Sequence, residues 1–109
     1  MYRGTTPTFT FTLPDEVDLT LAENVYVTFA KMNETIIFTK DKDDEDIEII
    51  AHSVEVYLTQ EETLALPIGQ VKVQLNWLYD DDGVTKRACS NKAVIQTSRN
   101  LIDEVLEIE

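Results

Sequence analysis

An alternation of apolar and polar residues with a period of two constrains the fold of this chain more than any other feature. It is clearest in QVKVQLNWLYD, residues 70–80, where every second side chain is apolar: Val71, Val73, Leu75, Trp77 and Tyr79. Successive side chains of a β-strand point to opposite faces of a sheet, so this pattern is typical of a half-buried strand. We therefore predict a strand here, with Trp77 on the core face rather than on an exposed sugar-stacking platform.

We expect strands in six other segments: the alternating or β-branched TFTFTL, NVYVTFAKM, ETIIFTK, DIEII and SVEVYLT, and a last strand in VTKRACSNKAVIQTS. In the last of these we expect a bend or bulge near Ser90 and Asn91. Short, closely spaced strands separated by polar turns indicate an antiparallel sandwich or barrel. Parallel pairing would need long crossovers, for which a chain of 109 residues with one core has no room.

One segment breaks the alternation. In TQEETLAL, Thr59 is followed three residues later by Glu62, which is the pattern of a capping box. Leu64 and Leu66 follow within the segment, and Pro67 and Gly69 then end the helix. We predict a single helical turn that connects two strands.

The final residues, NLIDEVLEIE, are unusually apolar for a terminus outside a sandwich. We divide the chain into a β-sandwich domain, residues 1–100, and a C-terminal arm, residues 101–109. Apolar residues recur at a spacing of four, which fits an amphipathic helix or an extended arm. The arm either packs on its own domain or docks on a neighbouring subunit or partner. Its candidate interaction residues are Leu101, Ile102, Val105 and Leu106.

Two tyrosines lie out of phase with the aliphatic residues of their strands. Tyr26 lies between Val25 and Val27, and Tyr57 lies between Val56 and Leu58. An aromatic ring with a polar tip is suited to an exposed or interfacial surface. We therefore add Tyr57 to the candidate interaction residues.

The chain is strongly acidic. It has 21 Asp and Glu against nine Lys and Arg, which gives a net charge of −12. Nucleic acids and anionic membrane surfaces require clustered cations, so both are disfavoured as partners. No apolar run approaches the roughly 20 residues of a membrane span. The segment MYRGTTPTFT lacks the apolar region of a signal peptide, so we expect synthesis and folding in the cytoplasm.

Two acidic clusters lie between predicted strands: DKDDED, residues 41–46, and DDDG, residues 80–83. Neither has the glycine at position six and the glutamate at position twelve of an EF-hand loop. We expect both to be solvated turns, with a hairpin at Asp82–Gly83. Weak calcium binding between the two loops is the alternative.

Nothing in the chain indicates catalysis. Adjacent acids on turns do not supply the fixed carboxylate pair of a glycosidase. With only Gly4, Gly69 and Gly83, no glycine-rich phosphate loop is present. The single cysteine, Cys89, excludes an internal disulfide, and we expect it to be a small, partly buried strand residue. A nucleophilic pair with the only histidine, His52, has no local support. We predict no catalytic residue, cofactor or metal.

Three segments in this order and spacing carry a resemblance to a known family. They are MYRGTTPTFTFTLP, then VEVYLTQEETLAL followed by QVKVQLNWL, and finally DEVL at residues 103–106. The chain resembles small proteins encoded in the structural gene clusters of phages and prophages of Gram-positive bacteria. It is also similar to the immunoglobulin-like N-terminal domain of phage upper-baseplate proteins. The resemblance covers nearly the whole chain but not the acidic clusters.

The resemblance implies an all-β fold: an immunoglobulin-like antiparallel β-sandwich of about seven strands with one short helical turn. It further implies a non-enzymatic structural role in the tail, baseplate or head of a virion, to which the protein would move from the cytoplasm. The N-terminal segment and the DEVL tail would contact other virion proteins or further copies of the chain. The alternative function is a carbohydrate- or cell-surface-binding β-sandwich module that is assisted by calcium.

Overall fold

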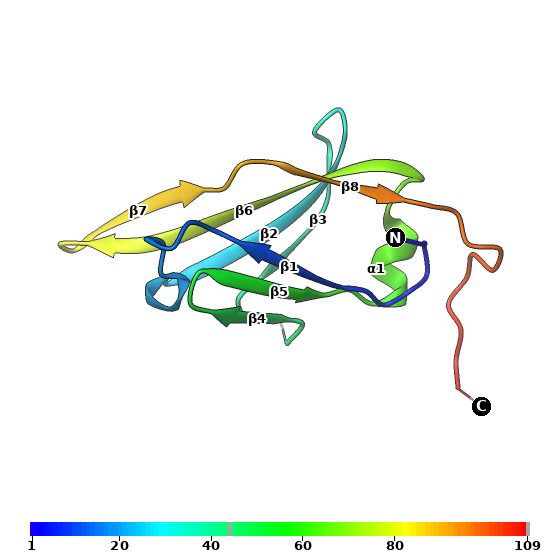
Figure 1. The fold of residues 1–109 in the computed structure, drawn as a ribbon, viewed down its shortest axis with the longest axis horizontal. Helices are drawn as coiled ribbons and strands as arrows, with labels where there is room; N and C mark the ends of the chain where they lie inside the picture. The colour runs from blue at the N-terminus through cyan, green and yellow to red at the C-terminus, as the bar shows by residue number, and fades with distance from the viewer. Residues whose placement is uncertain (44, 109) are drawn as a thin grey trace.

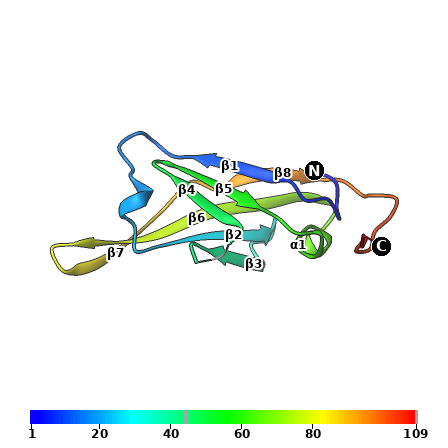
Figure 2. The same cartoon turned by 90° about the horizontal axis from the view of Figure 1, so that it is seen from below.

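A computed structural model describes residues 1–43 and 45–108. Asp44 of the first acidic cluster and Glu109 of the expected arm lie outside the described residues. The described chain forms two antiparallel β-sheets that pack face to face (Figure 1). In Figure 2 the two layers are seen from the side, with β1, β5 and β4 above β6, β2 and β3.

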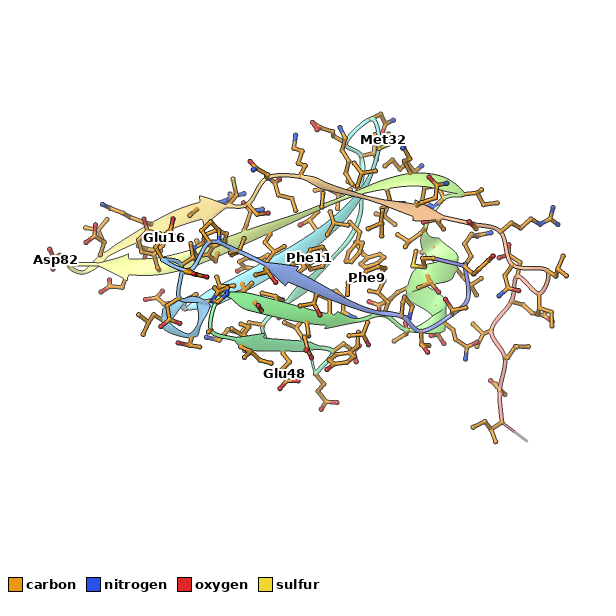
Figure 3. All side chains as sticks on the ribbon, in the orientation of Figure 1. Phe9, Phe11, Glu16, Met32, Glu48 and Asp82 are labelled. Carbon is orange, nitrogen blue, oxygen red and sulfur yellow. The ribbon has the colours of Figure 1, made fainter. Side chains whose placement is uncertain are left out.

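The smaller sheet has three strands in the order β1-β5-β4. They are β1 (Thr8–Thr12), β4 (Ile47–Ile50) and β5 (Ser53–Tyr57). Phe9 lies opposite Val56 and Phe11 lies opposite Val54, so the apolar residues of neighbouring strands share the inner face. Figure 3 shows Phe9 and Phe11 pointing from β1 toward the space between the sheets. The alternation in TFTFT therefore separates a core face from a threonine-covered outer face.

The larger sheet has the order β3-β2-β6-β7, and β8 pairs with the first part of β6. Its strands are β2 (Asn24–Lys31), β3 (Ile36–Asp41), β6 (Gly69–Asp81), β7 (Val84–Cys89) and β8 (Ala93–Thr97). Ser90 marks the break between β7 and β8. Its N–H donates to the Leu75 carbonyl over 2.9 Å, and its Oγ accepts the Leu75 N–H over 3.0 Å. The predicted bend at this position is confirmed.

The prediction of an all-β antiparallel sandwich with one short helix is confirmed. Hairpins join β2 to β3, β4 to β5 and β6 to β7 within their sheets. The link from β7 to β8 also stays within the larger sheet. Three links cross between the sheets, through the 3-10 turn η1 (Leu19–Leu21), the first acidic cluster and α1 (Gln60–Ala65). The described residues form eight strands rather than about seven, because the break at Ser90 divides the last predicted strand.

The core lies between the two sheets. Val25, Val27 and Phe29 on β2 are completely buried, and the Phe29 ring stacks on Phe38 with centroids 4.8 Å apart. On β6, Val71, Val73 and Leu75 are buried in the same way. Burial of each such side chain contributes about 1.5–3 kcal/mol to folding. Trp77 continues this face and packs against the core while remaining half-buried, which agrees with its predicted phase.

The predicted capping box starts α1. The Thr59 hydroxyl accepts the Glu62 N–H over 3.2 Å, and the Glu62 carboxylate accepts the Thr59 N–H over 2.9 Å. Two donors at the start of the helix are thereby satisfied. The buried Thr63 hydroxyl donates to the Thr5 carbonyl over 2.8 Å, which fixes the N-terminal segment against the helix.

The predicted hairpin at Asp82–Gly83 is also present. Both residues have positive φ angles, 52° and 82°, as a two-residue hairpin turn requires. Figure 3 shows Asp82 at the tip of this hairpin, at one end of a molecule whose extents are 52 × 34 × 21 Å. The helix α1 and both termini lie at the opposite end (Figure 1).

Cys89 differs from the prediction, because its side chain is exposed rather than partly buried. It pairs with Asn76, so its side chain lies on the outer face of the larger sheet rather than toward the core. His52 lies between β4 and β5 in the other sheet, with Nε2 at 3.4 Å from an oxygen of Asp15. The two residues therefore belong to different sheets.

Candidate protein-interaction site

The C-terminal segment, defined here as residues 101–108, forms neither helix nor strand. Of the two conformations expected from its sequence, the amphipathic helix is therefore wrong. The four candidate interaction residues of the segment are all exposed. Leu101 is 99 % exposed and Ile102, Val105 and Leu106 are between 40 and 55 % exposed. These side chains are directed away from the core of their own domain.

Polar contacts attach this segment to the sandwich domain. The Gln60 side chain in the first turn of α1 accepts the Leu106 N–H over 2.8 Å and donates to the Leu106 carbonyl over 3.0 Å. The amide thus bonds both backbone groups of one residue, as a neighbouring strand would. Further along the segment, Asp103 forms an ion pair with Arg3.

Arg3 joins the N-terminal segment, the helix and the C-terminal segment. Its Nε donates to the Leu66 carbonyl over 3.0 Å and its Nη2 donates to the Leu64 carbonyl over 2.7 Å. These carbonyls lie at the C-terminal end of α1, where a cation is favourable. The third contact of the guanidinium is the ion pair with Asp103. The position of the C-terminal segment is therefore coupled to the end of the helix.

The N-terminal segment is incorporated into the sandwich. Tyr2 forms a parallel bridge with Ser98, and the Arg3 N–H donates to the Ser98 carbonyl over 2.9 Å. Gly4 has a φ angle of +82°, and a Cβ there would lie 3.4 Å from the Leu64 side chain and 3.9 Å from the Ile102 carbonyl. A side chain at position 4 would be strained and crowded. Of the two expected contact elements, the C-terminal segment presents more exposed apolar side chains, since the N-terminal segment exposes Tyr2.

Strand β1 provides a second exposed feature, because it is an edge strand. The Leu58 N–H donates to Pro7 and the Leu13 N–H donates to His52, so the odd-numbered residues bond to the β5 side. In an antiparallel ladder the intervening residues direct their N–H and C=O groups to the other side. Among the described residues, no strand pairs with this edge at Thr8, Thr10 or Thr12. A groove of about 560 Å³ lies beside it, with Leu75 and Trp77 in its lining.

Tyr57 is exposed, as predicted, on the outer face of the smaller sheet. Its hydroxyl donates to Glu55 over 2.8 Å and lies 3.4 Å from Glu48. The hydrogen bond to the Glu55 carboxylate, together with the nearby negative charge, raises the pKa of Tyr57 to about 12. Tyr57 therefore belongs to a carboxylate-lined surface of β4 and β5, and its role in an interaction stays a prediction.

The first acidic cluster is only partly a solvated turn. Lys40 on β3 is 3 % exposed, and its ammonium donates to Asp46 over 3.1 Å, to Glu62 over 2.8 Å and to the Tyr57 carbonyl over 2.9 Å. Asp46 thus forms part of an ion network that joins both sheets and α1. The sequence prediction missed this network. The available signal was the period of β3, in which Lys40 follows Phe38 on the core face.

The described part of the chain offers no cluster of three or more His, Cys, Asp or Glu side chains that could hold a metal ion. It also contains no helix of the length and apolarity needed to cross a membrane. The chain was compared with protein-family models, with curated proteins and with solved structures, and none of the three comparisons gave a match.

Proposed function

We propose that this protein is a non-enzymatic structural protein that works through protein–protein contacts of its C-terminal segment. One observation carries the proposal: four apolar side chains of this segment face outward on a backbone that Gln60 and Arg3 hold in a defined position. Burial of a Leu, Ile or Val side chain at an interface contributes about 1.5–3 kcal/mol. A fixed backbone also lowers the ordering cost of binding.

The proposed setting is a phage or prophage particle, in its tail, baseplate or head. This part of the proposal rests on the resemblance of the sequence to phage structural-cluster proteins. In this setting the sandwich acts as a rigid spacer and the partners are other virion proteins or further copies of the chain. The edge of β1 is an additional contact element, because its outward backbone groups can pair with an added strand.

The experiment is mass spectrometry of purified particles from an induced host that carries either the wild-type gene or a Leu101→Asp/Val105→Asp variant. We expect stoichiometric copies in wild-type particles and loss of the variant from them. Leu21→Asp is the control, because Leu21 is also an exposed apolar residue, with an exposure between those of Leu101 and Val105, but lies on η1. Circular dichroism and thermal unfolding of the purified variants establish that the sandwich is folded. Incorporation of the Leu101→Asp/Val105→Asp variant at wild-type levels, or its failure to fold, contradicts the proposal.

Binding of cell-surface carbohydrate is the second candidate. The observation in its favour is the exposed Tyr57 ring beside the carboxylates of Glu48 and Glu55, since an aromatic face with nearby acceptors can stack on a sugar and bond its hydroxyls. The test is a glycan array with and without calcium, comparing the wild type with Tyr57→Ala. Glycan binding that Tyr57→Ala abolishes would support this function, and the absence of any glycan signal would eliminate it.

A further inference from the structure

The outer face of the larger sheet carries a groove of about 280 Å³ that differs in charge from the rest of the molecule. Three of the nine basic side chains of the chain line it, namely Lys72, Arg87 and Lys92, against one of the 21 acidic side chains, Glu34. Its apolar lining includes Ala30 and Ile36. In a chain with a net charge of −12, this groove is a local positive site.

Glu34 shows how the groove holds a carboxylate. Its oxygens lie 2.6 Å and 3.0 Å from the Lys92 ammonium and 3.4 Å from the Lys72 ammonium. The hydrogen bonds and charge of these two lysines hold the pKa of Glu34 below its usual value. Glu34 has a φ angle of 70°, in the turn between β2 and β3, so a non-glycine residue occupies the left-handed region there.

Arg87 remains available for a second carboxylate. Its Nε and Nη2 both donate to the amide oxygen of Asn76, over 3.1 Å and 3.0 Å. This acceptor is neutral, and within residues 1–43 and 45–108 no carboxylate oxygen forms an ion pair with Arg87. A guanidinium has five N–H donors in a fixed plane, so the Asn76 contacts orient it and leave other donors for a carboxylate. A shallow hollow of about 360 Å³ continues the groove past Thr28, Asn76 and Arg87.

We propose that this groove receives the C-terminal segment of a second copy of the chain. Charge complementarity selects this occupant. The segment carries Glu104 and Glu107 between its apolar residues, and neither forms an ion pair among the described residues. Asp103 is already paired with Arg3 of its own chain. Two copies with a net charge of −12 repel one another, so association requires that acidic groups of one meet the local positive site of the other.

This inference rests on the proposed function, because it names the surface that the same segment contacts. The test is sedimentation equilibrium of the purified full chain at low salt. We expect Lys72→Glu/Arg87→Glu in the groove and Glu104→Lys/Glu107→Lys in the segment each to weaken self-association by about ten-fold or more. The four substitutions combined in one chain should restore it, because the charges are then complementary again. At about 1 M salt the wild-type association should weaken, since the Debye length falls to about 3 Å.

The matched control is Lys31→Glu/Lys86→Glu, which makes the same change in net charge at two exposed lysines outside the groove. Its effect on self-association should stay within about two-fold. Circular dichroism of every variant confirms that a loss of association is not a loss of fold.

The outcomes separate the two proposals. If the Glu104/Glu107 and Leu101/Val105 variants weaken association while the groove variant does not, the segment binds elsewhere and the groove inference is overturned. A combined variant that fails to regain association overturns it as well, as does a wild-type chain that stays monomeric at all concentrations. If particle incorporation is also unaffected by Leu101→Asp/Val105→Asp, the proposed function fails too.

Discussion

Two charge clusters of this protein have opposite arrangements. In the first, one lysine, Lys40, lies between two carboxylates, those of Asp46 and Glu62. In the second, one carboxylate, that of Glu34, lies between Lys72 and Lys92. The lysine of the first is almost fully buried, whereas about half of the Glu34 side chain is exposed.

Burial gives the two clusters different physical roles. A buried ammonium has lost its water and depends on the protein oxygens that replace it, so the loss of one partner is costly. An exposed carboxylate exchanges its partners with water and ions at little cost. The Lys40 cluster therefore holds β3, β5 and α1 together. The Glu34 cluster lines a surface whose charged groups can form ion pairs with a second molecule.

The largest expected effect is that of Lys40→Ala. The substitution removes a buried cation and leaves Glu62 and Asp46 without its charge, so we expect the free energy of unfolding to fall by about 2–3 kcal/mol. The value lies at the lower end for buried pairs because both carboxylates reach solvent. Urea denaturation measures it. Lys31→Ala, at an exposed lysine of β2, is the control and should change stability by less than about 0.5 kcal/mol. Equal effects of the two substitutions would mean that the Lys40 cluster is not stabilising.

A smaller effect distinguishes the two acidic clusters. Asp46→Asn removes one charge partner of Lys40 and should cost about 1 kcal/mol, since Asp46 is partly exposed. Asp82→Asn should be nearly neutral, because Asn tolerates the positive φ angle of the hairpin turn. Thermal unfolding of both variants measures the difference. A larger loss for Asp82→Asn than for Asp46→Asn would contradict the distinction.

The contribution of the Glu34 cluster to folding stability should depend on pH and on salt concentration. The two lysines lower the pKa of Glu34 below its usual 4.5, so its contribution is present above that pH and disappears as the pH falls through the lowered value. Wild type and Glu34→Gln should therefore differ in melting temperature at neutral pH and converge in acid. High salt should reduce the difference at neutral pH. A difference that is the same at every pH and salt concentration would show that the charge of Glu34 is not its cause.

The smallest effect concerns Tyr57, whose hydroxyl lies beside the carboxylates of Glu48 and Glu55. Its raised pKa means that its contribution to stability is complete below about pH 10 and lost between about pH 10 and 12. The difference in ultraviolet absorbance between wild type and Tyr57→Phe, titrated with base, gives the ionisation of this one phenol. We expect a midpoint near 12. A midpoint near 10 would show that the Glu55 hydrogen bond does not persist in solution.

Local sequence patterns predicted most of the fold. The alternation in β6 identified a strand whose inner face is Val71, Val73 and Leu75, and the spacing of Thr59 and Glu62 identified the start of α1. The Asp82–Gly83 pair identified a hairpin. Each of these features depends on residues within a few positions of one another, where side-chain direction and turn geometry act directly.

The candidate sites were less predictable. The apolar character of residues 101–108 drew attention to the C-terminal segment, but its attachment through Gln60 and Arg3 joins positions 46 and 100 residues apart. The groove with Lys72, Arg87 and Lys92 gave no local signal, because these residues come from β6, β7 and the segment before β8. The outward direction of Cys89 likewise depends on its pairing with Asn76.

The sequence by itself determined the strands, the helical turn and the tight hairpin, because hydrophobic periodicity, capping and turn chemistry act over short stretches of chain. Only the tertiary structure decided which charged groups are buried, which form ion pairs and which face solvent. The two acidic clusters have similar compositions. The first supplies Asp46 to the buried Lys40, whereas the second forms the tip of a hairpin. The reason is that the energy of a charge depends on its burial and on partners brought close by folding, and both follow from how the two sheets pack together.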